Sequence, residues 1–230
     1  MAMTVVITGG FGTLGAAVGR AFKAAGANVG LIDHALSPTD EVAREFTGQC
    51  LLGGVDLTSF DAAQAALRTV AAKFGGLDAL INVAGGFRWE TVEEGSLDTW
   101  DDLYSMNLKT AVSACKAAIP LLIARGGGRI VNIGAAAASR GGLGMGAYAA
   151  SKSALARMTE SLAEELKDRN ITVNAILPAI IDTPVNRQEM PDADFLRWVQ
   201  PVSIANVISF LVSAQASAVT GAQIPVTHRC

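Results

Sequence analysis

The sequence predicts an α/β protein built on one doubly wound parallel sheet with helices on both faces. Strand-like and helix-like runs alternate strictly along the 230 residues, which is the order of repeated βαβ units. Several strand-like runs are continuously apolar, as expected for strands that are covered on both faces. The first run is followed at once by a glycine-rich turn, TGGFGTLG at 8–15, and then by a helix-like run.

The elements follow one another in a regular order. The predicted strands cover Thr4–Thr8, Asn28–Asp33, Cys50–Val55, Ala79–Val83, Arg129–Ile133, Thr172–Leu177 and Gln223–Val226. The predicted helices lie between them, near 13–26, 39–46, 59–74, 97–124, 148–169 and 202–214. Right-handed crossovers between such strands give a Rossmann-type sheet. We expect one domain over 1–230, because no linker, charge block or repeat interrupts the pattern.

Some elements carry further signals. The first strand is rich in β-branched residues, and the helix after it is rich in small ones. In the last helix an apolar stripe (Ile204, Val207, Ile208 and Leu211) follows helical spacing, which is typical of a helix packed on a core rather than a membrane span. The segment 178–201 is rich in Pro, Asp and Asn and follows a strand end, so it is a candidate substrate lid. Within it, Phe195 and Trp198 either cover a pocket or pack as a local core.

Composition excludes several classes of function. The net charge is −3, with neither a basic patch for nucleic acid nor an acidic tail. The cysteines Cys50, Cys115 and Cys230 form no C-x-x-C motif, so we expect no disulfide framework and no metal site. No signal peptide is evident at the N-terminus. We expect a cytoplasmic protein that binds a small-molecule substrate and neither nucleic acid nor membrane.

The glycine-rich turn predicts a nucleotide site. Glycine weakens helices and strands, so four glycines in eight residues indicate close backbone approach or an unusual turn. A strand, a glycine turn and a helix together aim free backbone N–H groups at a phosphate. The candidate residues here are Gly9, Gly12, Thr13, Leu14 and Gly15.

An acidic residue is expected at the end of the second strand. Asp33 lies there, 18 residues after Gly15, where a carboxylate accepts hydrogen bonds from ribose hydroxyls and repels a 2′-phosphate. The sequence therefore favours NAD(H), with NADP(H) possible. Asp56 and Leu57, after the third strand, are candidates to meet the adenine edge, although Asp56 equally fits a helix cap near Ser59.

Tyr148 and Lys152 are the candidate catalytic pair. Residues four apart share one face of a helix. The pKa of a free tyrosine is about 10, and we expect the neighbouring ammonium to lower it. Such a tyrosine exchanges a proton with a substrate oxygen while hydride moves to or from nicotinamide.

Taken together, these motifs resemble those of the short-chain dehydrogenase/reductase family over nearly the whole chain. Asn82-Val83-Ala84-Gly85 is similar to the family's Asn-Asn-Ala-Gly stretch, and 148–152 matches its Tyr-x-x-x-Lys. The resemblance implies that Ala84 and Gly85 bind the cofactor and that Asn107 holds a water of the proton relay. It also implies that the stretch 178–184, with Pro178, Ile181 and Thr183, meets the nicotinamide carboxamide.

One position departs from the family. The serine expected 13 residues before the tyrosine is replaced by Ala135. Loss of such a donor costs ~100-fold or more in rate for a carbonyl substrate. Ser139 replaces it only if the loop is rearranged.

Three functions remain open. The first is an NAD-dependent oxidoreductase acting on a carbonyl/alcohol pair. The second is a quinonoid dihydropteridine-type reductase: Ala135, the glycine spacing and Val83-Ala84-Gly85-Gly86-Phe87 resemble those enzymes. The third is an NAD-binding protein without catalysis.

Candidate substrate residues follow the fourth strand and precede Tyr148. They are Phe87, Arg88 and Met145, with Ala135 between them in sequence. Arg88 and Arg140 admit an anionic or polar planar substrate, or are simply solvated. The alanine-rich helices 97–124 and 148–169 are those through which the family pairs, so the resemblance implies a homodimer or homotetramer.

Overall fold

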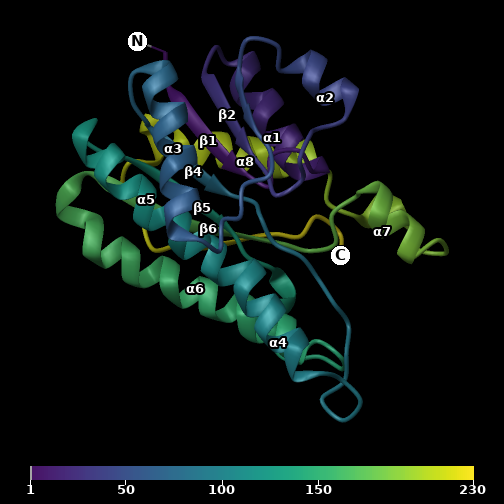
Figure 1. The fold of residues 1–230 in the computed structure, drawn as a ribbon. Coiled ribbons are helices and arrows are strands. Elements are labelled where there is room, and N and C mark those ends of the chain that lie inside the picture. Colours follow the sequence, from purple (N-terminus) through teal and green to yellow (C-terminus); the bar gives the residue numbers. More distant parts are fainter. Residues whose placement is uncertain (1) are drawn as a thin grey trace.

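The computed structural model describes residues 2–230 and contains a seven-stranded parallel sheet of order β3-β2-β1-β4-β5-β6-β7 (Figure 1). Its strands are β1 (Thr4–Thr8), β2 (Asn28–Ile32), β3 (Cys50–Leu52), β4 (Ala79–Asn82), β5 (Gly128–Ile133), β6 (Ile171–Pro178) and β7 (Gln223–Val226). All neighbouring strands pair in parallel. The strand order reverses between β1 and β4, which confirms the predicted doubly wound fold class.

Helices cover both faces of the sheet. One face packs against α1 (Thr13–Ala24), α2 (Asp40–Glu45) and α8 (Pro201–Val212). The other packs against α3 (Phe60–Phe74), α5 (Thr110–Ala124) and α6 (Gly146–Leu166). Two further helices lie away from the sheet (Figure 1). Helix α4 (Leu97–Tyr104) packs against α6, whereas α7 (Pro184–Glu189) lies at the side of the molecule.

The alternation of side chains along each strand explains the two cores. In β1, Val5 and Ile7 pack in the cluster that contains α1 and α8, whereas Val6 packs in the cluster of α3 and α5. The stripe predicted on α8 is part of the first cluster, since Ile204 and Ile208 are fully buried. Strands β1, β2 and β4 therefore contribute apolar residues to both faces.

Several element boundaries differ from the prediction. The second strand ends at Ile32, and the third ends at Leu52, just before the chain bends at Gly54. The run 97–124 is not one α-helix, since five residues between α4 and α5, Ser105–Lys109, form a π-helix. A π-turn inserts an extra residue into the helix, and it is often found at functional sites.

The helical run 97–124 is also apolar. Within residues 2–230 it is the run that is long and apolar enough to cross a membrane by length and composition, with mean hydropathy 1.2. However, 56% of that stretch is buried inside the fold, where it packs against α3 and α6. This burial is typical of a core helix.

The predicted lid, 178–201, is smaller than expected. Pro178 is the last residue of β6, and Val199 forms an isolated bridge with Ile181. Trp198 is 3% exposed, and its ring lies 4.7 Å from that of Phe195. These two aromatic residues therefore pack as a local core, and the part that projects is α7.

Candidate active site

A cleft of about 1150 Å³ lies along the carboxyl ends of the strands. This is the edge at which open α/β sheets bind ligands. The cleft runs from the glycine turn after β1 to α7. Many of the sequence-predicted residues line it: Gly9, Gly12, Leu14, Gly15, Asp33, Asp56, Leu57, Ala84, Gly85, Phe87, Ala135, Met145, Tyr148, Lys152, Pro178 and Ile181.

The glycine turn is shaped by close backbone contacts. Gly9 has φ +63°, and a Cβ at Gly15 would lie 2.1 Å from the Gly9 carbonyl oxygen. Helix α1 begins directly after Gly12, and no side chain caps its N-terminus. Its first backbone N–H groups therefore face the cleft without a side-chain acceptor, as a phosphate-binding turn requires.

Gly12 differs from Gly15 in a way that can be tested. Gly12 has φ −74°, which any residue adopts, and a Cβ there would meet only the Gly9 oxygen at 3.5 Å. We expect Gly15→Ala to lower the free energy of unfolding by about 3 kcal/mol, because backbone atoms must move. Gly12→Ala should leave stability nearly unchanged and weaken NADH binding by about tenfold, because its methyl group enters the cleft.

Denaturant titration and NADH fluorescence titration measure the two effects. Equal loss of stability in Gly12→Ala and Gly15→Ala would contradict the assignment of Gly12 to a ligand.

The two candidate acids occupy one end of the cleft. The Asp33 carboxylate accepts hydrogen bonds from the backbone N–H groups of Phe11, at 2.9 Å, and Ala35, at 3.0 Å. Asp33 is thereby fixed beside the glycine turn. Asp56 accepts hydrogen bonds from the hydroxyl and N–H of Thr58, which lower the pKa of its carboxyl group. The cap of α3 is Ser59, so Asp56 organises the preceding turn and also lines the cleft.

Tyr148 and Lys152 lie toward the other end of the cleft. Burial raises the pKa of the Tyr148 phenol to about 12, and the Phe87 ring packs edge-on at 5.0 Å. The expected lowering of this pKa by Lys152 is therefore wrong for the structure, because desolvation of the phenolate dominates. Burial also lowers the pKa of Lys152 to about 8, and its Nζ donates to the Ile133 carbonyl at 2.8 Å.

Asn107 lies behind the cleft and does not line it. Its side chain is fully buried, accepts a hydrogen bond from the Gly86 N–H at 2.9 Å and donates to the Gly86 carbonyl and the Ser151 hydroxyl. A Cβ at Gly85 would lie 2.6 Å from the Asn107 Oδ1 and 3.1 Å from the Lys152 Nζ. Asn107 thus joins the π-helix to the segment after β4 and to α6, and the relay water that the family resemblance implies for it stays a prediction.

The alanine that replaces the family serine faces the cleft. Ala135 is 5% exposed and lines the cleft just after β5. Ser139 is exposed, lies outside the cleft lining and donates its hydroxyl to the Ala136 carbonyl at 2.8 Å. The structure therefore does not place Ser139 where it replaces the missing hydroxyl.

Three further predicted residues are not in the cleft lining. Arg88 donates to the Thr99 hydroxyl at 3.0 Å and lies 3.5 Å from the Asp102 carboxylate, so it is held against α4. Thr13 begins α1 without lining the cleft, and Thr183 caps α7 by accepting from the Asn186 N–H at 3.2 Å. For Arg88 and Thr183 the hydrogen bonds to nearby residues explain the position of the side chain, which residue type alone does not predict.

The protein-family comparison identifies the group to which this arrangement belongs. Residues 3–194 match the model of the short chain dehydrogenase family. The chain belongs to the short-chain dehydrogenases. This assignment confirms the family resemblance of the sequence.

Other short-chain dehydrogenases are similar over most of their length. D-beta-hydroxybutyrate dehydrogenase from Rhizobium meliloti is 32% identical over 90% of this chain and 83% of its own. Meso-2,3-butanediol dehydrogenase from Serratia marcescens is 32% identical over 96% of this chain and 92% of its own. The structure of a short-chain type dehydrogenase/reductase from Mycobacterium ulcerans matches with TM-score 0.89 and 27% identity, covering 99% and 89% of the two chains.

Short-chain dehydrogenases use NAD(P)(H), and the cleft of this one fits such a group. The N-terminus of α1, which no side chain caps, is free to bind a pyrophosphate. Packing within the protein does not require glycine at position 12, because a Cβ there would meet only the Gly9 oxygen at 3.5 Å. Asp33 lies at one end of the cleft, beside the glycine turn, and Lys152 lies toward the opposite end. The comparisons give no support to the pterin reductase alternative.

The cleft also contains residues that sequence reasoning did not single out. They include His34, Asp102, Ser105, Met106, Asn186, Glu189 and Met190. His34 follows Asp33 and Met106 precedes Asn107 in the sequence, so their position beside a motif residue could have indicated that they line the cleft. Glu189 and Met190 come from the predicted lid, and only the path of the folded chain brings them to the cleft.

Proposed function

We propose that this protein is an NAD(H)-dependent oxidoreductase that transfers hydride between nicotinamide and a small carbonyl/alcohol substrate. The observation that carries the proposal is the shared cleft, which joins the glycine turn and Asp33 to Tyr148 and Lys152. When bound, the dinucleotide supplies or accepts the hydride. The chain itself provides binding, orientation and the proton.

Tyr148 is the proposed acid/base. With a pKa of about 12 its phenol is protonated at neutral pH, so it donates a proton to a carbonyl oxygen as that oxygen gains negative charge. In the opposite direction Tyr148 accepts the proton of the substrate alcohol.

Lys152 has the supporting role. Its pKa of about 8 leaves the ammonium charged at neutral pH, and one of its three protons is used by Ile133. The remaining donors are available to ribose hydroxyls and to the phenol oxygen. Asn107 keeps Gly86 and Ser151 in register, and so keeps α6 aligned with the segment after β4.

Asp33 supports the preference for NAD(H). We expect Asp33→Asn to lower the ratio of NADH affinity to NADPH affinity by about tenfold, because the amide no longer repels a 2′-phosphate. Titration of both cofactors measures this ratio. Asp40→Asn, which removes a carboxylate on α2 outside the cleft lining, is the matched control and should leave it unchanged. An unchanged ratio in Asp33→Asn would refute the role of this carboxylate.

A substrate panel with NADH tests the proposed reaction. Neutral ketones, diketones and a quinonoid dihydropterin are compared by the loss of NADH absorbance. Turnover of ketones supports the proposal, and turnover of the pterin alone selects the second candidate, which Ala135 favours. Binding of NADH with no turnover of any compound supports a non-catalytic protein.

We also propose a homodimer or homotetramer through helices 97–124 and 148–169, in the reducing cytoplasm. Tyr104, Val112 and Ile123 are exposed apolar or aromatic residues on the first of these segments, and all three cysteines are free. Light scattering distinguishes two or four chains from one.

A further inference from the structure

The substrate end of the cleft is apolar with acidic side chains. Its apolar lining comes from the loop after β4, the π-helix, the loop before α6 and the lid: Phe87, Met106, Met145, Ile180 and Met190. Asp102 and Glu189 line the same end. Among the described residues that line the cleft, Lys152 is the one lysine or arginine, and it is 5% exposed.

The arginines near this end are engaged elsewhere or lie outside the lining. Arg88 is held by Thr99 and Asp102. Arg187 on α7 donates to both oxygens of Asp182, at 2.6 and 2.8 Å, and this pairing lowers the pKa of Asp182 to about 2. Arg140 does not line the cleft. No arginine of the described residues 2–230 is therefore placed to receive a substrate carboxylate.

Glu189 differs from Asp102 in its surroundings. Asp102 lies 3.5 Å from Arg88, so its charge is partly balanced. Glu189 is the last residue of α7 and is exposed, and its carboxylate forms neither a hydrogen bond nor an ion pair with any residue in the range 2–230. The negative charge of Glu189 is therefore not balanced by a partner, and it repels an anionic molecule that enters the cleft beside α7.

We propose that Glu189 makes this cleft select neutral substrates over anionic ones. The proposal rests on the proposed function and names its substrate class: uncharged ketones or alcohols that contact the methionines and Phe87. The names of the relatives do not decide whether the substrate of this chain is neutral or anionic. One is a dehydrogenase of a hydroxy acid and another of a neutral diol, and both are 32% identical.

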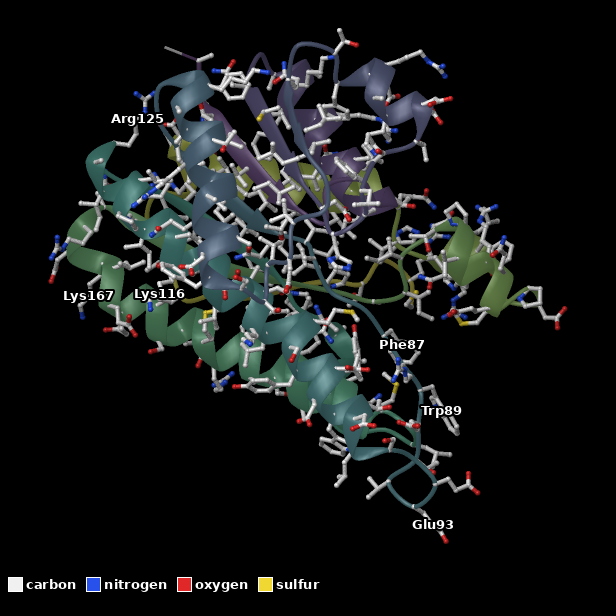
Figure 2. All side chains as sticks on the ribbon, in the orientation of Figure 1. Phe87, Trp89, Glu93, Lys116, Arg125 and Lys167 are labelled. Atoms are coloured by element: carbon white, nitrogen blue, oxygen red, sulfur yellow. The ribbon has the colours of Figure 1, made fainter. Side chains whose placement is uncertain are left out.

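The test compares matched neutral and anionic ketones, ethyl acetoacetate and acetoacetate, with NADH. We expect kcat/KM to favour the ester by at least ~10-fold at low salt, and this preference should shrink in 1 M NaCl, where charges are screened within about 3 Å. Glu189→Lys should reduce the preference by about fivefold or more. Glu93→Lys is the matched control, because Glu93 lies at the tip of the loop between β4 and α4, away from the cleft (Figure 2).

A binding measurement keeps this inference separate from the proposed function. Cyclohexanecarboxamide and cyclohexanecarboxylate are titrated into the protein with NADH by calorimetry, which requires no hydride transfer. Tighter binding of the amide, lost in Glu189→Lys and kept in Glu93→Lys, supports the inference even if no ketone is reduced. Equal binding of the two compounds to the unmodified protein, or equal effects of the two lysine variants, overturns it. Failure to reduce any ketone counts against the proposed function alone.

Discussion

Replacing Tyr148 by phenylalanine is expected to lower kcat for ketone reduction by ~1,000-fold or more, because general acid catalysis contributes about 100- to 10,000-fold. The phenol faces the cleft with its pKa raised to about 12, so it carries the proton that the carbonyl oxygen needs. The ring of phenylalanine keeps the edge-on contact with Phe87, which lies 5.0 Å away. We therefore expect NADH affinity and thermal stability to change little.

The chain offers a matched control for this substitution. Tyr104 is the other tyrosine of the sequence, is 54% exposed and does not line the cleft. Tyr104→Phe should retain full kcat. If Tyr148→Phe keeps more than about a tenth of the activity, another group donates the proton and the proposed mechanism is wrong.

Restoring the missing hydroxyl is the second large expected effect. We expect Ala135→Ser to raise kcat/KM for neutral ketones by about 10- to 100-fold, since a second donor would stabilise the developing oxyanion beside Tyr148. Ala135 has φ −155°, an extended backbone that serine adopts without strain, and its side chain faces the cleft. The hydroxyl is therefore expected to face the cleft.

Ala137→Ser provides the comparison, because Ala137 also lines the cleft but is exposed. It should leave kcat/KM within about twofold of the unmodified protein. An unchanged or lower rate in Ala135→Ser would show that the natural substrate does not use this donor, as expected for a quinonoid pterin. Stopped-flow measurement of hydride transfer separates this effect from product release.

Much of the fold was predictable because its signals are local. The strand starts at Thr4, Asn28, Ala79 and Gln223 follow from β-branched and apolar runs, and the structure begins β1, β2, β4 and β7 at these residues. The π-helix around Asn107 was not predictable in this way. Its sequence, SMNLK, continues a helical pattern, and the extra residue in the turn accompanies contacts with Gly86 and Ser151, which are distant in sequence.

In the candidate site, too, short local motifs were predictable and contacts between distant segments were not. Gly9, Asp33, Tyr148 and Lys152 were found from short motifs, because phosphate cradles, ribose-binding acids and helix pairs each need fixed residue types at fixed spacing. The position of Arg88 was not predictable in this way, since its guanidinium has partners on α4 that no spacing rule reveals.

The sequence by itself determined the α/β alternation, the nucleotide turn and the family, because these depend on periodicity and spacing along the chain. Only the tertiary structure showed the burial of Tyr148, which raises the pKa of its phenol, and the charged side chains that line the cleft beside α7. Both depend on which residues of distant segments surround a group: burial disfavours the phenolate, and α7 brings Glu189 to a cleft whose neighbouring arginines are already paired or outside it.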